Sequence, residues 1–80
     1  MTNNPFANPY SAITVSPSNT VNLKHPSVVY CGGAGNIKVT SATNSGTVTF
    51  NNVQAGEWLR LVVNKVWASD TTCSGIIATW

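Results

Sequence analysis

Charge is scarce in this sequence. Lysine, arginine, aspartate and glutamate make up 8% of the chain, against about 25% in ordinary globular domains. The formal net charge of +2 is too small and too scattered to indicate a nucleic-acid-binding surface. Polarity comes from asparagine, threonine and serine, which together account for 28 of the 80 residues. So little charge is typical of a chain that works inside a larger assembly, because an isolated monomer needs charge for solubility.

Histidine and cysteine are also rare. One histidine, His25, and two cysteines, Cys31 and Cys73, cannot alone build a zinc site, and no metal or other cofactor is expected. His25 could formally join Asp70 and Cys31, or a serine, in a catalytic triad. However, no G-x-S-x-G motif is present, and Glu57 and Asp70 lie at the edges of turns, which does not favour an acid/base pair. The sequence therefore predicts a protein that is not an enzyme.

The sequence begins without the basic and apolar regions of a signal peptide, and no run approaches the ~18 apolar residues of a membrane span. We therefore expect synthesis in the cytoplasm, no membrane partner and reduced cysteines. Cys31 and Cys73 are expected to be buried thiols that act as small hydrophobic side chains. The alternative is one disulfide between them, formed after the protein has left the cell in a particle.

Eighty residues allow one domain with a small core. A chain of this size buries only about 60% of the surface that its unfolded form exposes. Small domains usually need disulfides, a metal or a partner subunit to be stable. With at most one disulfide available, oligomerisation is the expected supplement.

The pattern of apolar residues is that of short strands. No window of ten or more residues has apolar side chains at helical spacing, and turns rich in Gly, Asn, Ser and Pro recur every 8–12 residues. The expected strand segments are 13–15, 21–24, 27–31, 37–40, 47–50, 58–67 and 76–80. We therefore predict an all-β fold, a small β-sandwich or barrel of about six short strands over residues 13–80. Residues 1–12 are expected to form an extended N-terminal arm, in which Phe6 and Tyr10 can dock onto a neighbour.

The longest run, Trp58 to Trp67, is apolar on both faces. Alternation places Leu59, Leu61 and Val63 on one face, and Trp58, Arg60, Val62, Asn64 and Val66 on the other. A strand with one face in solvent normally carries polar residues there. Part of the second face is therefore expected to be covered by another subunit.

Glycines cluster in the segment YCGGAGNIKV. A dinucleotide or phosphate loop needs a further glycine at fixed spacing and a following helix. Here Gly32, Gly33 and Gly35 lie between two strand-like runs. We therefore predict a hairpin turn, in which glycine supplies positive φ angles.

Aromatic residues allow two interpretations. Trp58, Trp67 and Trp80 could form a stacking platform for a sugar or a single-stranded nucleic acid. Such a platform normally comes with a basic groove, and the chain has four lysines and arginines. Packing in the core and at a subunit interface is therefore favoured. Trp80, preceded by Ile76 and Ile77, is expected to be pinned in a strand or an interface.

The order of segments resembles the small spike base proteins of tailed phages and gene transfer agents. The resemblance rests on ITVSPSNTVNL (13–23), VVYCGGAGNIKV (28–39) and GTVTFNNVQAGEWLRLVVNKVWASDTTCSGIIATW (46–80). These are similar to a V-T-P-S-D opening, a Y-V-G-G-A-G hairpin, a V-T-F-x-x-V-x-A-G segment and a final I-V-A-L-W. The chain departs from that pattern at Asn19, Cys31, Arg60 and Cys73, where Asp, Val, Pro and Ala are common.

This resemblance implies a structural protein on the capsid surface of a virion, where family members form a ring at a vertex and hold a spike or fibre protein. The implied partners are further copies of the chain, as a pentamer or trimer, the major capsid protein and a spike or fibre protein, without nucleic acid. The expected interface residues are Trp58, Arg60, Val62, Trp67, Ile76, Ile77, Trp80, Phe6 and Tyr10. One alternative is a cement protein at three-fold capsid positions. Another, from a different class, is a small carbohydrate-binding adhesion module.

Overall fold

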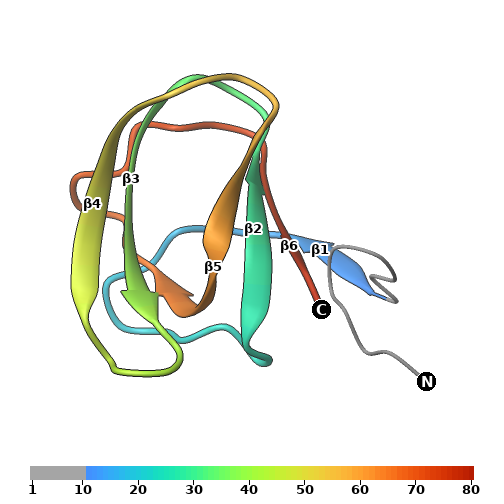
Figure 1. Cartoon of the computed structure of the whole chain (residues 1–80), viewed down its shortest axis with the longest axis vertical. Helices are drawn as coiled ribbons and strands as arrows, with labels where there is room; N and C mark the ends of the chain where they lie inside the picture. The colour runs from blue at the N-terminus through green and yellow to red at the C-terminus, as the bar shows by residue number, and fades with distance from the viewer. Residues whose placement is uncertain (1–10) are drawn as a thin grey trace.

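The computed structural model describes residues 11–80 of the chain and contains six β-strands (Figure 1). They are β1 (Ala12–Thr14), β2 (Ser27–Cys31), β3 (Gly35–Ser41), β4 (Thr47–Val53), β5 (Glu57–Val66) and β6 (Ile76–Thr79). All pairings are antiparallel, and the strands form one sheet in the order β1-β6-β2-β5-β3-β4. The prediction of an all-β fold is confirmed. The architecture is a single open sheet that curls around its core, rather than two separate sheets or a closed barrel.

A bend in β5 makes the sheet curl. The first part of β5 pairs with β2, and the last part pairs with β3, so Val63 faces Ser27 on one side and Ser41 on the other. The register with β3 shifts between Thr40, which faces Lys65, and Ser41, which faces Val63. The shift leaves Asn64 as an extra residue, and such a bulge bends a strand. As a result β3 and β4 lie across the molecule from β2, β6 and β1 (Figure 1).

The bulge also corrects the expected faces of β5. Strict alternation placed Val66 on the outer face with Trp58 and Arg60. In the structure Val63 and Val66 are both buried, at 0% and 2% exposure, because the extra residue between them shifts the alternation by one. Trp58 and Arg60 precede the bulge and remain exposed.

The core lies inside the curl and is built mainly from β-branched side chains. Along β3, buried residues alternate with half-buried ones, and Ile37 and Val39 are fully buried. The buried cluster consists of Val15, Val29, Cys31, Ile37, Val39, Val53, Leu59, Val63, Val66, Cys73, Ile76 and Ala78. Every strand except the exposed β1 contributes to it, so the core depends on contacts between distant parts of the chain.

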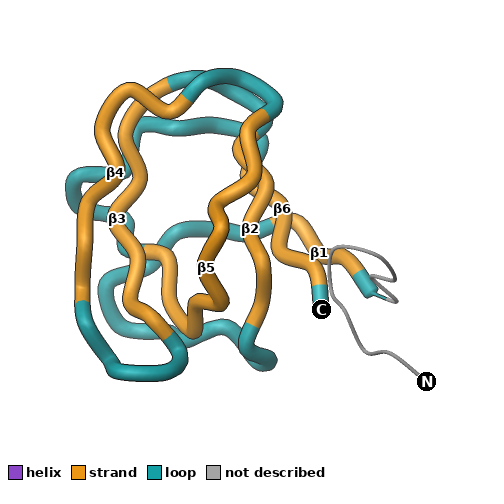
Figure 2. The backbone as a smooth tube through the Cα atoms, in the orientation of Figure 1, coloured by secondary structure: helices purple, strands orange, loops and turns teal. Residues whose placement is uncertain are grey.

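Two long connections, residues 15–26 after β1 and residues 67–75 after β5, run across the curled sheet (Figure 2). The first, after β1, was expected to contain a strand at 21–24, which is wrong. Its backbone touches β5 only at single points, for example where the Leu23 N–H donates to the Asn64 carbonyl at 2.8 Å, so no ladder forms. The Asn19 side-chain oxygen accepts the N–H groups of Ala68 and Ser69, at 3.1 and 3.0 Å, and ties this connection to the second one.

The predicted hairpin turn at Gly32, Gly33 and Gly35 is also wrong. β2 and β3 are not neighbours in the sheet, because β5 lies between them. The glycines instead allow close packing against the 67–75 connection, where the Gly32 N–H donates to the Gly75 carbonyl at 3.1 Å. At Gly35, φ is +155° and a Cβ would lie 2.9 Å from the Cys73 nitrogen. A strand follows the glycines rather than the helix that a phosphate loop requires.

Both cysteines lie in the core as free thiols, as predicted. Burial raises the pKa of Cys31 from 9.0 to about 12, with smaller contributions from Cys73 beside it and from Glu57. In the unfolded chain the thiol ionises near its ordinary pKa, whereas the buried thiol stays protonated to a higher pH. The contribution of this thiol to the free energy of unfolding is therefore fully present below the ordinary pKa and is lost as pH rises toward the raised pKa.

We expect the free energy of unfolding of the reduced chain to fall as pH rises above 9, with the Cys31 contribution gone near pH 12. The loss assigned to Cys31 should be on the order of 2–3 kcal/mol by pH 11. Urea titrations from pH 8 to 11 measure it, with C31A as the control that lacks the titrating group. Equal pH slopes for the two proteins would contradict the assignment.

Candidate interaction surface

The large exposed apolar side chains fall into two groups. Val48, Phe50 and Trp58 lie on β4 and the start of β5, and Ile13 and Val21 lie on β1 and the connection after it. β1 and β4 are the two edge strands of the sheet. An edge strand has one row of backbone N–H and C=O groups without a partner, which can pair with another chain. The two apolar groups therefore lie beside the two edge strands, neither of which has a second strand partner within residues 11–80.

β4 has an exposed edge without the usual protection. All of its residues from Thr47 to Asn52 are exposed, and only Val53 is buried. The strand contains no charged residue and no proline, and these are the residues that normally prevent edge-to-edge association. Val48 and Phe50 are 45% and 37% exposed. This strand was not among the expected interface residues, although its lack of charge was visible in the sequence.

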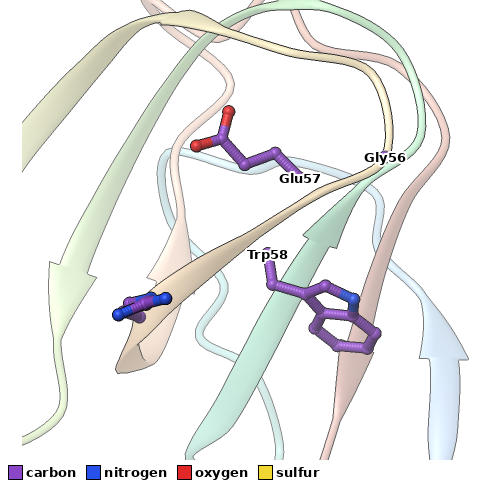
Figure 3. A pocket seen from close by; sticks show the side chains of 4 residues that line it. Gly56, Glu57 and Trp58 are labelled. Carbon is purple, nitrogen blue, oxygen red and sulfur yellow. The ribbon is translucent and has the colours of Figure 1, made fainter.

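A groove separates the second half of β4 from the first half of β5. It is lined by Phe50, Asn51, Asn52, Val53, Glu57, Trp58, Leu59 and Arg60. It exists because β3 pairs only with the last part of β5, which leaves the outer edge of Glu57–Arg60 without a strand beside it. A neighbouring hollow is lined by Gly56, Glu57, Trp58 and Arg60. The side chains of Glu57 and Trp58 point to opposite sides of the strand (Figure 3).

Trp58 is held in place although it is 42% exposed. It lies opposite Tyr30 in the β2–β5 ladder, and the two rings are 5.1 Å apart at an interplanar angle of 58°. Such tilted aromatic pairs are favourable. A large ring that is already ordered loses little entropy when a partner covers it, which is a property of binding hot spots.

The second groove lies beside β1, and its lining is mainly apolar. It is lined by Ile13, Thr14, Val15, Ser16, Val21, Asn22, Leu23, Lys24, His25, Ser27, Ala78 and Trp80. The Trp80 ring stacks on His25 at 4.7 Å and 19°. Its backbone N–H and C=O bond to Ser11, each at 3.1 Å. Trp80 is therefore pinned beside β1, as the sequence predicted.

Trp67 is engaged within its own chain. Its Nε1 donates to Thr40 Oγ1 at 2.9 Å, and the Lys65 ammonium lies 3.9 Å from the ring centroid. Lys38 lies 4.9 Å from the same ring and pairs with Asp70 at 3.7 Å. These cation–π contacts and the Nε1 hydrogen bond engage the Trp67 ring with its own chain. The three tryptophans thus lie in three different settings and do not form one stacking platform.

The expected interface residues are only partly brought together. Trp58 and Arg60 lie in the same groove, and Val62 and Ile77 are half-buried. Ile76 was expected at the interface, which is wrong, because its side chain is 2% exposed and packs in the core. Phe6 and Tyr10 lie outside the described residues.

Chemistry-bearing side chains are dispersed. His25 lies against Trp80, and Asp70 lies against Lys38, so the formal triad is not assembled. Within residues 11–80, no group of three His, Cys, Asp or Glu side chains is placed to hold a metal ion. None of the described segments is a helix long and apolar enough to cross a membrane.

A scan against models of known protein families finds no match, and a search of curated proteins finds none. Among solved structures, the fold is similar to a chain of the structure described as "Capsid of native GTA particle computed with C5 symmetry", where GTA denotes gene transfer agent. The TM-score is 0.78 and the sequence identity is 24%, over 91% of this chain and 84% of the other. At this identity the similarity establishes a shared fold.

Proposed function

We propose that the chain is a non-enzymatic structural protein of a phage-like particle, attached to the outside of its capsid. The observation that carries the proposal is the fold shared, over 91% of the chain, with a chain of a gene transfer agent capsid. The exposed edges, the scarcity of charge and the dispersed titratable groups support an assembly role. Within that role, we propose an oligomeric spike base or decoration protein.

Self-association would use the two open edges. β1 and β4 lie at opposite ends of one sheet, and each has an exposed apolar group beside it. Because the two groups differ in sequence and shape, β4 of one copy would meet β1 of the next rather than another β4. Contacts of this head-to-tail kind close into rings or extend into filaments.

Charged residues line the grooves beside both edges. Lys24 lines the groove beside β1, and Glu57 and Arg60 line the groove beside β4. All three are exposed. In a head-to-tail contact Lys24 would pair with Glu57 only in a register that keeps it away from Arg60, so these charges would restrict the register. Trp58 would supply the ordered apolar anchor.

Capsid attachment can be tested directly. Particles purified from the organism that encodes the chain should carry it through a density gradient, and W58A should lower its occupancy at least tenfold, the loss typical of a hot-spot aromatic. W58F keeps an aromatic ring on Tyr30 and serves as the matched control. Absence of the wild-type chain from the particles would contradict the proposal.

The native mass of the wild-type chain then distinguishes the spike base from the cement protein and from the carbohydrate-binding module. A pentamer would favour a five-fold spike base, and a trimer would favour the three-fold cement protein. A monomer that binds glycans through Trp58, and is absent from particles, would replace the proposal with the carbohydrate-binding alternative.

A further inference from the structure

The two cysteines come from distant parts of the sequence and meet in the core. Cys31 is the last residue of β2 and is 0% exposed, and Cys73 lies in the 67–75 connection and is 8% exposed. Both belong to the same buried cluster, and Cys73 lies close enough to Cys31 to help raise the pKa of the Cys31 thiol. They are the only cysteines in the chain.

Backbone hydrogen bonds tie together the two segments that carry the cysteines. The residues after Cys31 bond to the residues after Cys73, with Gly32 N–H donating to Gly75 at 3.1 Å and Gly33 N–H donating to Ser74 at 2.8 Å. The Cys73 N–H itself donates to the Asn36 carbonyl at 3.1 Å. The close approach of Gly35 to Cys73 leaves no room for a Cβ there. The segments that carry the two cysteines are therefore held next to each other by backbone hydrogen bonds, with Cys31 itself facing Ile76.

We propose that Cys31 and Cys73 are a disulfide-forming pair, which closes to one intrachain bridge when the folded protein meets a small disulfide oxidant such as glutathione disulfide. This inference concerns the fold itself and is independent of the capsid role. The structure describes the reduced form, with both thiols free.

The reaction takes place in two exchange steps. The Cys73 thiolate, from the more exposed residue, attacks glutathione disulfide, which forms a Cys73–glutathione mixed disulfide and releases one glutathione. The Cys31 thiolate then attacks the Cys73 sulfur and releases the second glutathione. Two protein thiols are thereby oxidised and one glutathione disulfide is reduced to two glutathiones, with the two thiol protons passing to the glutathiones.

The bridge would fasten the 67–75 connection to the end of β2. It would cross-link residues that are far apart in the sequence, and bridges that close long loops restrict the unfolded chain most. A reducing cytoplasm would keep the pair open, and an oxidising exterior would close it. The protein would therefore be more stable in an oxidising environment than in a reducing one.

The test is the equilibrium of the purified full chain in glutathione buffers of varied ratio, acid-quenched and read by mass spectrometry. The bridged chain is lighter than the reduced chain by two hydrogens. The fraction of bridged chain at each glutathione ratio gives the effective concentration of one thiol relative to the other. We expect this effective concentration to be at least 100-fold higher in the native protein than in 6 M guanidinium. The bridged protein should also melt about 10 °C higher than the reduced one, an advantage that dithiothreitol removes.

Effective concentrations equal in native and denaturing buffer would overturn the proposal, because they would mean that folding does not hold the thiols in place. Accumulation of glutathione on both cysteines, or of disulfide-linked dimers on a non-reducing gel, would also overturn it. C73S keeps Cys31 alone and should give neither the lighter species nor the melting shift. The wild-type equilibrium needs no variant, so the test remains decisive even if C73S folds poorly.

Discussion

Replacing Ile37 by alanine is expected to lower the free energy of unfolding by about 3–4 kcal/mol, within the range of large-to-small changes in protein cores. Ile37 is the largest of the fully buried side chains and lies at the centre of β3, with the core on one side and no solvent contact. Its removal leaves a cavity. The strands cannot easily move in to fill this cavity because backbone hydrogen bonds hold them in the sheet. The melting temperature should fall by roughly 15–25 °C, since 1 kcal/mol corresponds to about 4–8 °C in a domain of this size.

The same substitution at Ile13 is the matched control. Ile13 lies in β1 and is 54% exposed, so I13A should change the free energy of unfolding by no more than about 0.5 kcal/mol. Urea titration and thermal melts at low protein concentration measure both variants without a contribution from association. Similar losses for I37A and I13A would mean that the core does not lie inside the curl of the sheet.

Blocking either edge of the sheet is expected to prevent the proposed oligomer from forming and to leave a monomer. In the first variant V48K and F50K place two charges on β4, and in the second I13K and V21K place two charges beside β1. Each position is exposed in the single chain, so the substitutions should cost little folding stability. Burying two unpaired charges in a contact is costly, so each variant alone should remain at the mass of the 8.4 kDa chain.

Mixing the two variants provides the decisive step. A head-to-tail contact needs one intact β4 edge and one intact β1 edge, and the mixture still offers one such pair. It should therefore form a one-to-one dimer that grows no further, which native mass spectrometry and sedimentation can identify. If β4 paired with β4, the second variant would still form a dimer by itself, and the mixture would contain no mixed species. That result would refute the head-to-tail arrangement and leave capsid attachment unaffected.

Much of the candidate surface could be identified only from the structure. Trp58 and Arg60 were expected at an interface because they lie on a strand face that mixes apolar with polar residues. Val48 and Phe50 were missed, since alternation within β4 matches an ordinary half-buried strand. Their exposure follows from the position of β4 at the end of the sheet, which depends on how distant strands pair. Ile76 was misplaced for the same reason, because period-two alternation gives two faces and does not identify the buried one.

The sequence by itself determined the class of fold, the approximate positions of the six strands and the burial of the cysteines. These features follow from local chemistry, since β-branched residues at period two favour strands and Gly, Asn, Ser and Pro favour turns. The tertiary structure alone decided which strands are neighbours, where β5 bends and why the glycines after Cys31 are needed. It also decided that Cys31 and Cys73 share one buried cluster and that β1 and β4 lie at the two ends of the sheet. The physical reason is that in a sheet each strand's partner is set by backbone hydrogen bonds between distant segments, and these leave almost no mark on the local sequence pattern.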